Sequence, residues 1–458
     1  MKLGIKNIGV IDSAEIELDG ITVIAGINNK GKSTVGKTLF ALLHEMDEWD
    51  KIYTEIWSGR IYSFLVEQSA ALEDFGMEIS GAKRRRTGKA NLLARRYSVN
   101  EDFFAAIEDT QLMEGDSDLA AFLTEYAAEY IALYVKKEQK IISQQFKEVI
   151  SDWTEKTAKK VQTIELDELV LQRGGLQSSF GRVFGDQYRK IGTDASHISF
   201  EAEGRTVEIS IKEEWEMDIP LRIHSRVHFL ESPRIFDMLS DTRYGHVQRE
   251  YLQYLMRPNT VVQKNVFRST PGGAEASVET GKSVTEIIQK LTGTMKGRAD
   301  FYQKVGLEFK DERFQGTIHA VNVSTGVKAL ALLEYALRIG AILENDILIL
   351  DEPEINLHPE WQVIYAGALV RLQKYFGIRV LLTTHSPYFI RAIECYTDIE
   401  SQMSRLNVYR AENCDDKSGV TFENLSYSEF GLTSLYDDLS ASLDQLEEQL
   451  EEGTGEDA

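Results

Sequence analysis

Apolar and acidic residues alternate near the start of the chain. Positions 14, 16 and 18 are apolar and flank Glu15 and Glu17, which is the period-two pattern of a strand with one buried face. Asp19-Gly20 indicates a tight turn before an apolar strand over residues 21–25. A loop bounded by glycines and a helical stretch from Lys32 to about Met46 follow. The first fifty residues therefore predict the order strand, loop, helix.

Residues 51–198 have a different pattern. Aromatic and aliphatic residues at positions 122, 126, 130, 133 and 134, and again at 142, 146, 149 and 150, recur at helical spacing, with Lys and Glu opposite them. This pattern predicts a mainly helical insertion. It contains a basic cluster: Lys83, Arg84, Arg85, Arg86, Lys89, Arg95 and Arg96.

Strand character returns after the insertion. Residues 198–204 and 207–211 predict a hairpin, and residues 227–230 another strand. Residues 235–300 favour helices and loops, with a turn-rich segment at 269–273. From Leu307 onward, strands and helices alternate as in an α/β domain. Residues 431–458 predict an acidic helix and tail with leucines at positions 435, 439, 443, 446 and 450.

Composition limits the possible classes of function. The formal charge of -22 argues against a nucleic-acid footprint over the whole surface, although a local basic groove stays possible. Two cysteines, Cys395 and Cys414, provide no disulfide framework and no zinc-ligand spacing. No apolar run is long enough to span a bilayer, and the start lacks the apolar core of a signal peptide. We expect a cytoplasmic protein without a membrane partner.

The strongest motif lies between the second predicted strand and the first helix. Gly26-Ile27-Asn28-Asn29-Lys30-Gly31-Lys32-Ser33-Thr34 fits the pattern G-x-x-x-x-G-K-[ST]. Glycines let backbone N–H groups surround phosphates at a helix N-terminus. We expect the loop to bind nucleotide through Gly26, Asn28, Asn29, Lys30, Gly31, Lys32, Ser33 and Thr34. Within this set, Lys32 is expected to reach the β and γ phosphates, and the Ser33 hydroxyl is expected to bind Mg²⁺.

Two further apolar runs end in polar residues. Residues 347–350 predict a buried strand that delivers Asp351 and Glu352 at its carboxyl end. Adjacent carboxylates after a core strand are costly unless a cation neutralises them, so we expect Asp351 to hold Mg²⁺ and Glu352 to polarise water. Residues 381–384 predict a second strand that ends at His385, a candidate γ-phosphate sensor.

These motifs resemble the Walker A, Walker B and switch histidine of ABC-type P-loop ATPases. That family carries a signature, typically L-S-G-G-Q, at a helix start before Walker B. Here Val323-Ser324-Thr325-Gly326-Val327 precedes a helical run from Lys328 to about Leu343, keeping the serine and one glycine. The resemblance implies that Ser324, Thr325, Gly326 and Lys328 bind the γ-phosphate held by a second copy. ATP would then join two heads, and hydrolysis would release them.

The chain looks most like the SMC, RecF and OLD group of these ATPases, through Lys6-Asn7-Ile8-Gly9 and through Asp351-Glu352-Pro353-Glu354-Ile355-Asn356-Leu357-His358-Pro359. This implies an α/β ABC-type head over residues 1–50 and 199–430, with a mixed sheet core and an antiparallel β subdomain. Residues 51–198 form the helical insertion. No Q-loop glutamine is evident; Glu231-Ser232-Pro233-Arg234 occupies that location.

Three biological roles stay open. Resemblance to compact ATPases of bacterial two-gene modules, such as Septu- or PARIS-like systems, implies a sensor or regulator of a separate effector, such as a nuclease, in anti-phage defence. The acidic leucine-rich tail is then a candidate docking element, or simply a helix packed on its own domain. The alternative is RecF- or SMC-like action on DNA in repair, with nucleic acid bound through Lys83–Arg96. The ATPase of a transporter is a third reading, which the degenerate signature disfavours.

Overall fold

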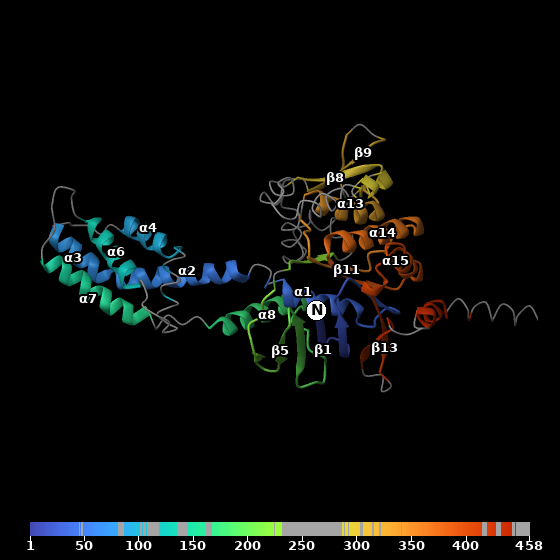
Figure 1. Cartoon of the computed structure of the whole chain (residues 1–458), viewed down its shortest axis with the longest axis horizontal. Coiled ribbons are helices and arrows are strands. Elements are labelled where there is room, and N and C mark those ends of the chain that lie inside the picture. Colours follow the sequence, from blue (N-terminus) through green and yellow to red (C-terminus); the bar gives the residue numbers. More distant parts are fainter. Residues whose placement is uncertain are drawn as a thin grey trace, which may run out of the picture. The chain divides into compact units, whose positions relative to one another are not determined.

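The computed structural model describes most of the chain in two units. It describes residues 1–44, 46, 49–80, 87–100, 103, 107, 119–134, 144–161, 167–223, 225–230, 286–287, 289–291, 293–302, 306–313, 316–319, 322–339, 341–414, 419–426, 432–441 and 445. Unit 1 comprises Met1–Asp47 and Gln172–Ala458, and unit 2 comprises Glu48–Leu171. Figure 1 shows the elements of both units in sequence colours.

Unit 1 is built on one large mixed sheet. Its strands run in the order β6-β5-β4-β1-β2-β14-β13-β3-β12-β11-β7. Their bounds are β1 Lys2–Ile8, β2 Ile11–Glu17, β3 Ile21–Ala25, β4 Ser196–Ala202, β5 Arg205–Ile211, β6 Trp215–Met217, β7 Val227–Leu230, β11 Ile347–Asp351, β12 Arg379–Thr384, β13 Leu406–Asn413 and β14 Val420–Asn424.

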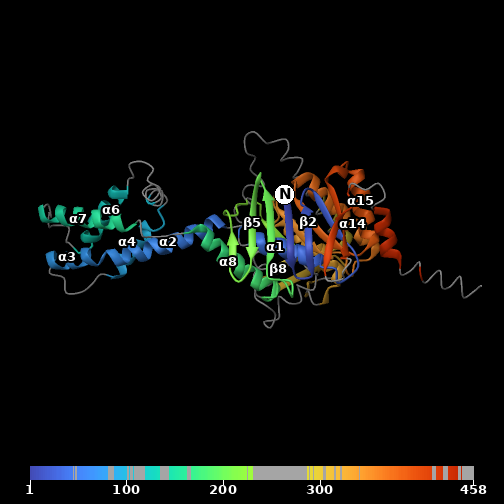
Figure 2. The ribbon, with the colours of Figure 1, turned by 90° about the horizontal axis from the view of Figure 1, so that it is seen from below.

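The two halves of this sheet differ in strand direction. From β6 to β2 every neighbouring pair is antiparallel, and Figure 2 shows β5 and β2 in this half. From β13 through β3, β12 and β11 to β7 every pair is parallel. The predicted α/β class, with a mixed sheet core and an antiparallel part, is confirmed; the two parts share one continuous sheet.

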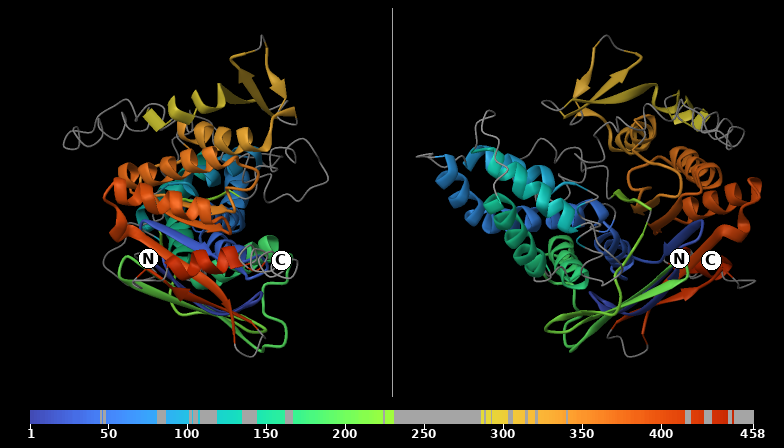
Figure 3. Two further views of the ribbon diagram at one scale, coloured as in Figure 1. Left: turned by 90° about the vertical axis from the view of Figure 1, so that its right-hand side faces the viewer. Right: turned by 60° about the vertical axis from the view of Figure 1, so that its left-hand side comes forward.

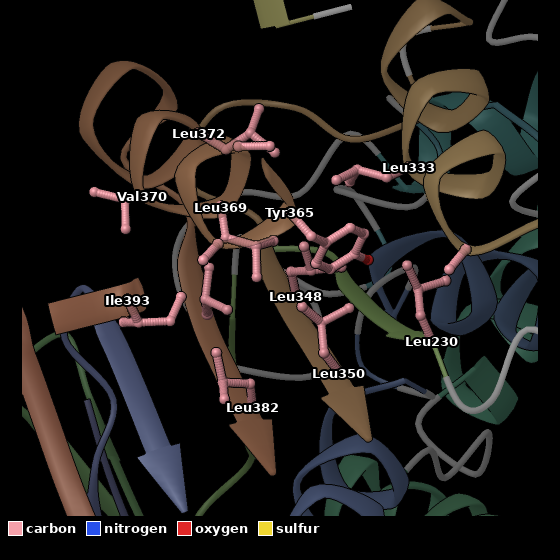
Figure 4. Packing of buried hydrophobic residues seen from close by; sticks show 14 of the residues in the cluster. Leu230, Leu333, Leu348, Leu350, Tyr365, Leu369, Val370, Leu372, Leu382 and Ile393 are labelled. Atoms are coloured by element: carbon pink, nitrogen blue, oxygen red, sulfur yellow. The ribbon is translucent and has the colours of Figure 1, made fainter. Parts of the chain in front are cut away.

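Helices cover both faces of the parallel half, which explains its uninterrupted apolar runs. Helix α1 (Lys32–Leu43) packs on the face that carries Ile349, and a Cβ at Gly36 would lie 3.0 Å from the Ile349 side chain. Leu348 and Leu350 point to the opposite face, into the main core cluster. Figure 4 shows Leu348, Leu350 and Leu382 meeting Tyr365 and Leu369 there.

Three helices supply most of that second layer. They are α13 (Thr325–Arg338), α14 (Pro359–Phe376) and α15 (Pro387–Ile399), and their orange ribbons lie together in Figure 3. A three-stranded sheet of order β10-β9-β8 belongs to the same unit: β8 Gly297–Tyr302, β9 Gly306–Asp311 and β10 Ile318–His319. A short 3₁₀ turn, η2 (Met403–Arg405), precedes β13.

The described part of unit 2 consists of helices around an aromatic core. They are α2 (Trp49–Gln68), α3 (Ala70–Ser80), α4 (Thr87–Tyr97), α6 (Leu119–Ala132) and α7 (Gln144–Val161). Tyr126 is fully buried, shares a hydrogen bond of 2.8 Å with Ser69 and stacks on Trp153. The helical pattern predicted from positions 122–134 is present, and Tyr126 and Tyr130 are buried as that pattern requires.

The helical insertion was predicted to end at residue 198, whereas the boundary between the two units lies between Leu171 and Gln172. Helix α8 (Glu168–Phe184) crosses that boundary, and from Gln172 onward it belongs to unit 1. The buried amide of Gln172 accepts from Leu221 N at 2.8 Å and donates to Leu221 O at 3.1 Å. Phe180 packs edge-on against Trp215. These long-range contacts, rather than helical periodicity, set the boundary.

Candidate nucleotide site

The phosphate loop connects the end of β3 to the start of α1. Gly26, Asn29 and Gly31 all have positive φ angles, 145°, 64° and 66°. Gly31 is the N-cap of α1, and no side chain caps this helix. A Cβ at Gly31 would lie 2.9 Å from Val10, so both conformation and space require glycine. Thr34 N donates to Gly31 O at 3.0 Å, and since no side chain caps α1, this helix N-terminus can bind an anion.

Lys32 folds back over this loop. Its side chain is only 4% exposed, and its Nζ donates to the carbonyls of Gly26 at 2.7 Å and Ile27 at 2.9 Å. Nζ also lies 3.7 Å from Oε1 of Glu352. Burial lowers the pKa of Lys32, and the carboxylates of Glu352 and Asp351 partly oppose that shift. The ammonium group is therefore held among acceptors that phosphate oxygens can replace.

Asp351 ends β11 and Glu352 follows it, and both are fixed by the neighbouring strand. The Thr383 hydroxyl donates to Oδ1 of Asp351 at 2.5 Å. The Glu352 N–H is shared between the carbonyl and the hydroxyl of Thr383, both at 3.1 Å. Glu352 has φ 47°, a left-handed conformation that is strained for a residue with a side chain. Strain of this kind is characteristic of functional turns.

His385 follows β12 and faces the same acids. Its Nδ1 lies 3.4 Å from Oε1 of Glu352 and 3.7 Å from Oε1 of Glu354. Neither contact is a hydrogen bond, because Nδ1 has no hydrogen-bond partner within the described ranges. The residue pairs Asp351↔Thr383 and Thr384↔Ala25 show that β11, β12 and β3 end side by side. The structure thus brings Lys32, Asp351, Glu352 and His385 together.

Glu354 is a buried member of this group to which the sequence analysis gave no role. The Thr384 hydroxyl and the His385 N–H, at 3.2 Å, both donate to its Oε1. Burial raises its pKa, and these hydrogen bonds partly oppose the shift. A third acid in the run Asp351-Glu352-Pro353-Glu354 was the available signal. Thr383 was missed as well, since a threonine in a buried strand gives no sign of which carboxylate it will bind.

The remaining loop residues surround the start of α1. Asn28 and Asn29 are exposed, and Lys30, Ser33 and Thr34 are half-buried. Mg²⁺ held with phosphates needs only one or two protein ligands. Ser33 and Asp351 provide the required oxygen donors, which suits Mg²⁺. In the described part of the chain, no group of three or more His, Cys, Asp or Glu side chains is arranged so that it could hold a metal ion by itself.

The predicted signature lies at the start of α13. Ser324 is the N-cap of this helix and accepts from Val327 N at 3.5 Å. The helix spans Thr325–Arg338 rather than the predicted Lys328 to about Leu343, because capping by Ser324 fixes an earlier start. The atoms nearest a Cβ at Gly326 belong to Asn356 and Trp361, at 3.3 Å. Ser324 and Thr325 thus stand at a helix N-terminus packed on the turn after Walker B.

Lys328 lies in the first turn of α13 and is 3% exposed within this chain. Its contact with a phosphate held by a second copy stays a prediction.

Other predicted elements are only partly within the described residues. Lys83–Arg86, Glu231–Arg234 and most of the acidic tail lie outside them. In α4, Lys89 and Arg95 are exposed, whereas Arg96 pairs with Glu129. Among the described helices, none combines the length and apolar character needed to cross a bilayer.

The start of the predicted tail helix packs against its own unit. Leu435 is fully buried in the main core, and Leu439 packs against that core. Asp438 pairs with Arg410 at 2.8 Å. These two leucines are therefore not available as a docking element; the leucines at positions 443, 446 and 450 lie outside the described residues.

Comparisons with known proteins point to one family. A family profile described as AAA ATPase domain matches residues 1–390. No curated protein matches the chain by sequence.

Solved structures similar to the chain include an SMC head domain from Thermotoga maritima, with 11% identity, 92% of this chain and 97% of that chain covered, and a TM-score of 0.33. An SMC head bound to the C-terminal winged-helix domain of ScpA has 10% identity, 93% and 98% coverage, and a TM-score of 0.37. A third, an SMC head with an extended coiled coil derived from Pyrococcus furiosus, has 10% identity, 98% coverage of both chains and a TM-score of 0.33.

The assignment rests on the profile match, which covers most of the 458 residues and includes the phosphate loop, Asp351, Glu352 and His385. The chain therefore belongs to the AAA ATPase domain family.

Proposed function

We propose that the chain binds ATP with Mg²⁺ and hydrolyses it to ADP and phosphate. The observation that carries this proposal is the meeting of Lys32, Asp351, Glu352 and His385 at the carboxyl ends of three adjacent parallel strands. Ligands of open α/β sheets bind at this edge. The buried Lys32 ammonium and the uncapped N-terminus of α1 suit the phosphates. Mg²⁺ supplies neutralisation of charge on the phosphates when bound.

Each side chain has a distinct part in the proposed reaction. Lys32 exchanges its loop carbonyls for phosphate oxygens. Asp351, with Oδ1 already bound to Thr383, keeps Oδ2 for the metal or its water. Glu352 accepts a proton from the water that attacks the γ-phosphorus, while the bond between that phosphorus and the β-phosphate oxygen breaks and ADP leaves. His385 contacts the γ-phosphate through its other ring nitrogen.

The proposal extends to pairing of two heads around ATP. Its support is the placement of Ser324 and Gly326 at the N-terminus of α13, where Gly326 packs on Asn356 and Trp361. A helix N-terminus of this kind can bind the phosphate held by another copy. Lys328, in the first turn of the same helix, belongs to the same prediction.

At the biological level, we propose that the ATPase regulates a separate effector, such as a nuclease, in anti-phage defence. This role rests on the resemblance to compact ATPases of bacterial two-gene modules. RecF- or SMC-like action on DNA is an equal alternative, supported by the exposed Lys89 and Arg95 on α4. DNA binding that weakens steeply with salt would favour the second role. Capture of a stoichiometric protein partner by the ATP-bound form would favour the first.

The test of the ATPase and of pairing uses Glu352→Gln. We expect this variant to bind ATP, to lose hydrolysis, and to increase in mass with ATP and Mg²⁺, as measured by light scattering. Glu201→Gln, an exposed change on β4, is the matched control and should behave like the wild type. Unchanged mass with ATP bound would contradict pairing, and unchanged hydrolysis would contradict the role of Glu352.

Composite sites can be tested by mixing two inactive variants. Lys32→Ala removes the phosphate contact of one chain, and Ser324→Arg blocks the signature of the other. A mixed pair then contains one site built from an intact loop and an intact signature. We expect ATPase activity to appear on mixing; continued inactivity would contradict sites shared between copies.

A further inference from the structure

Glu354 is the most deeply buried acid of the site. Its side chain is 3% exposed, and both groups that donate to its Oε1 belong to the end of β12, namely the Thr384 hydroxyl and the His385 N–H. Its Oε2 has no hydrogen-bond partner within the described residues. A carboxylate that is buried with one oxygen unsatisfied is costly. Burial also raises the pKa of Glu354.

The turn that carries Glu354 is itself fixed. Ile355 N donates to Glu352 O at 3.1 Å, and Leu357 N donates to Glu354 O at 2.9 Å. Glu352 starts this turn in a left-handed conformation. The Glu354 carboxylate is therefore held in place by the backbone after β11, and it binds β12 rather than following it.

The backbone pairing between β11 and β12 ends just before the residues that bind the Glu354 side chain. The last backbone pair is Asp351↔Thr383. Beyond it, the two residues that follow in β12 and its loop bind the Glu354 side chain instead. Glu354 is thus a contact between the turn after β11 and the backbone of His385, beside the pairing of Thr384 with Ala25. The distance from His385 Nδ1 to Glu352 Oε1 in this arrangement is 3.4 Å.

We propose that Glu354 is a positioning residue, which anchors the backbone of His385 so that Nδ1 faces Glu352 and the other ring nitrogen faces the substrate phosphate. This inference rests on the proposed ATPase function. It predicts that moving the acceptor oxygen lowers kcat much more than it changes KM for ATP. A misplaced catalytic group typically costs about 10- to 100-fold, and we expect Glu354→Ala and Glu354→Asp to fall in that range. Glu354→Gln keeps an acceptor oxygen at the same place and should recover most of the rate.

Asp346 offers a matched control at the other end of β11. It is also 3% exposed, and its Oδ2 binds the buried His228 at 2.9 Å and Arg226 at 3.1 Å. It lies away from the phosphate loop, one residue before β11 begins. Asp346→Ala therefore removes a buried carboxylate of equal burial that also positions a histidine, and it should leave kcat unchanged.

The experiment measures ATP turnover and the ring signals of ¹³C-labelled histidines in the full chain. Glu354→Ala and Glu354→Asp should shift the His385 Cε1–Hε1 signal, assigned from a His385→Gln spectrum, and leave that of His228 in place. Asp346→Ala should do the reverse. An unmoved His385 signal, or a kcat equal to that of the wild type, would overturn the proposal.

The two levels of the proposal fail in different ways. A wild-type chain without ATPase activity would refute the proposed function, whereas the His385 signal would still test whether Glu354 holds that ring. If Glu354→Ala does not fold, Glu354→Asp carries the test, because it keeps the charge and withdraws the acceptor by one methylene. Full loss of activity in Glu354→Gln with an unchanged His385 signal would also contradict positioning, since the acceptor would then be present without effect.

Discussion

Thr383→Val removes one hydroxyl while nearly preserving the volume of a buried side chain. That hydroxyl donates to Asp351 and accepts from the Glu352 N–H. The Glu352 N–H keeps the Thr383 carbonyl at 3.1 Å, so only the bond to the Asp351 carboxylate lacks a replacement. A hydrogen bond to a charged group contributes about 1.5–3 kcal/mol. At about 1.4 kcal/mol per tenfold in rate, the loss of Asp351 orientation should lower kcat/KM by roughly 10- to 100-fold.

The assay is steady-state ATP turnover as a function of Mg²⁺ concentration. Because Asp351 is the proposed metal ligand, Thr383→Val should require more Mg²⁺ for half-maximal activity. The free energy of unfolding in urea should fall by about 1.5–3 kcal/mol, the contribution of the same hydrogen bond. Thr383→Ser keeps the hydroxyl and should retain most activity. Thr397→Val deletes an equally buried hydroxyl, bonded to Ile393 O in α15, and should leave turnover intact. Wild-type turnover and Mg²⁺ dependence in Thr383→Val would refute the reasoning.

The other expected outcomes concern charge and packing. Lys32→Met should abolish binding of a fluorescent ATP analogue yet keep or raise the thermal midpoint, because burial of the ammonium lowers the Lys32 pKa and so opposes folding at neutral pH. Leu435→Ala should cost about 2–5 kcal/mol in urea unfolding, and Leu439→Ala less, since only Leu435 is fully buried. Burial raises the pKa of Glu354 above 4.5, so the folded chain holds that proton more tightly than the unfolded chain. Wild-type stability should therefore fall relative to Glu354→Gln as pH rises from about 4.5 through the raised pKa, and a constant difference across that window would contradict the shift.

Local sequence patterns predicted the parts of the site that depend on local structure. The spacing of Gly26, Gly31 and Lys32 requires a tight loop before a helix, and each of these residues meets that need by its own conformation or charge. The apolar run 347–350 indicated a strand covered on both faces. In the structure, α1 packs on one face through Gly36, and Leu348 packs into the main core on the other. Here the residues that decide the structure are neighbours in sequence.

The features that the sequence did not predict depend on contacts between residues far apart in the chain. Helix α8 has the same periodicity as the insertion helices, yet Gln172 joins it to the backbone of Leu221. The start of α13 was also predicted incorrectly, by three residues: the helix begins at Thr325 and not at Lys328. Ser324 is a favourable N-cap, but the glycine and β-branched residues that follow it have low helix propensity. Packing of Gly326 on Asn356 and Trp361 favours the helix there, and no local pattern contains that contact.

The same reasoning explains why the site combines costly features. Lys32 is buried, Glu352 is in a left-handed conformation, and Glu354 leaves one oxygen unsatisfied. None of these features favours folding by itself. Together, these features keep the acids and the lysine from forming close ion pairs, because backbone and threonine contacts hold them apart. The distance from Lys32 Nζ to Glu352 Oε1 is 3.7 Å. A relaxed site would let these charges satisfy one another and leave less reason to bind phosphate. The structural cost therefore preserves affinity for the charges that the nucleotide brings.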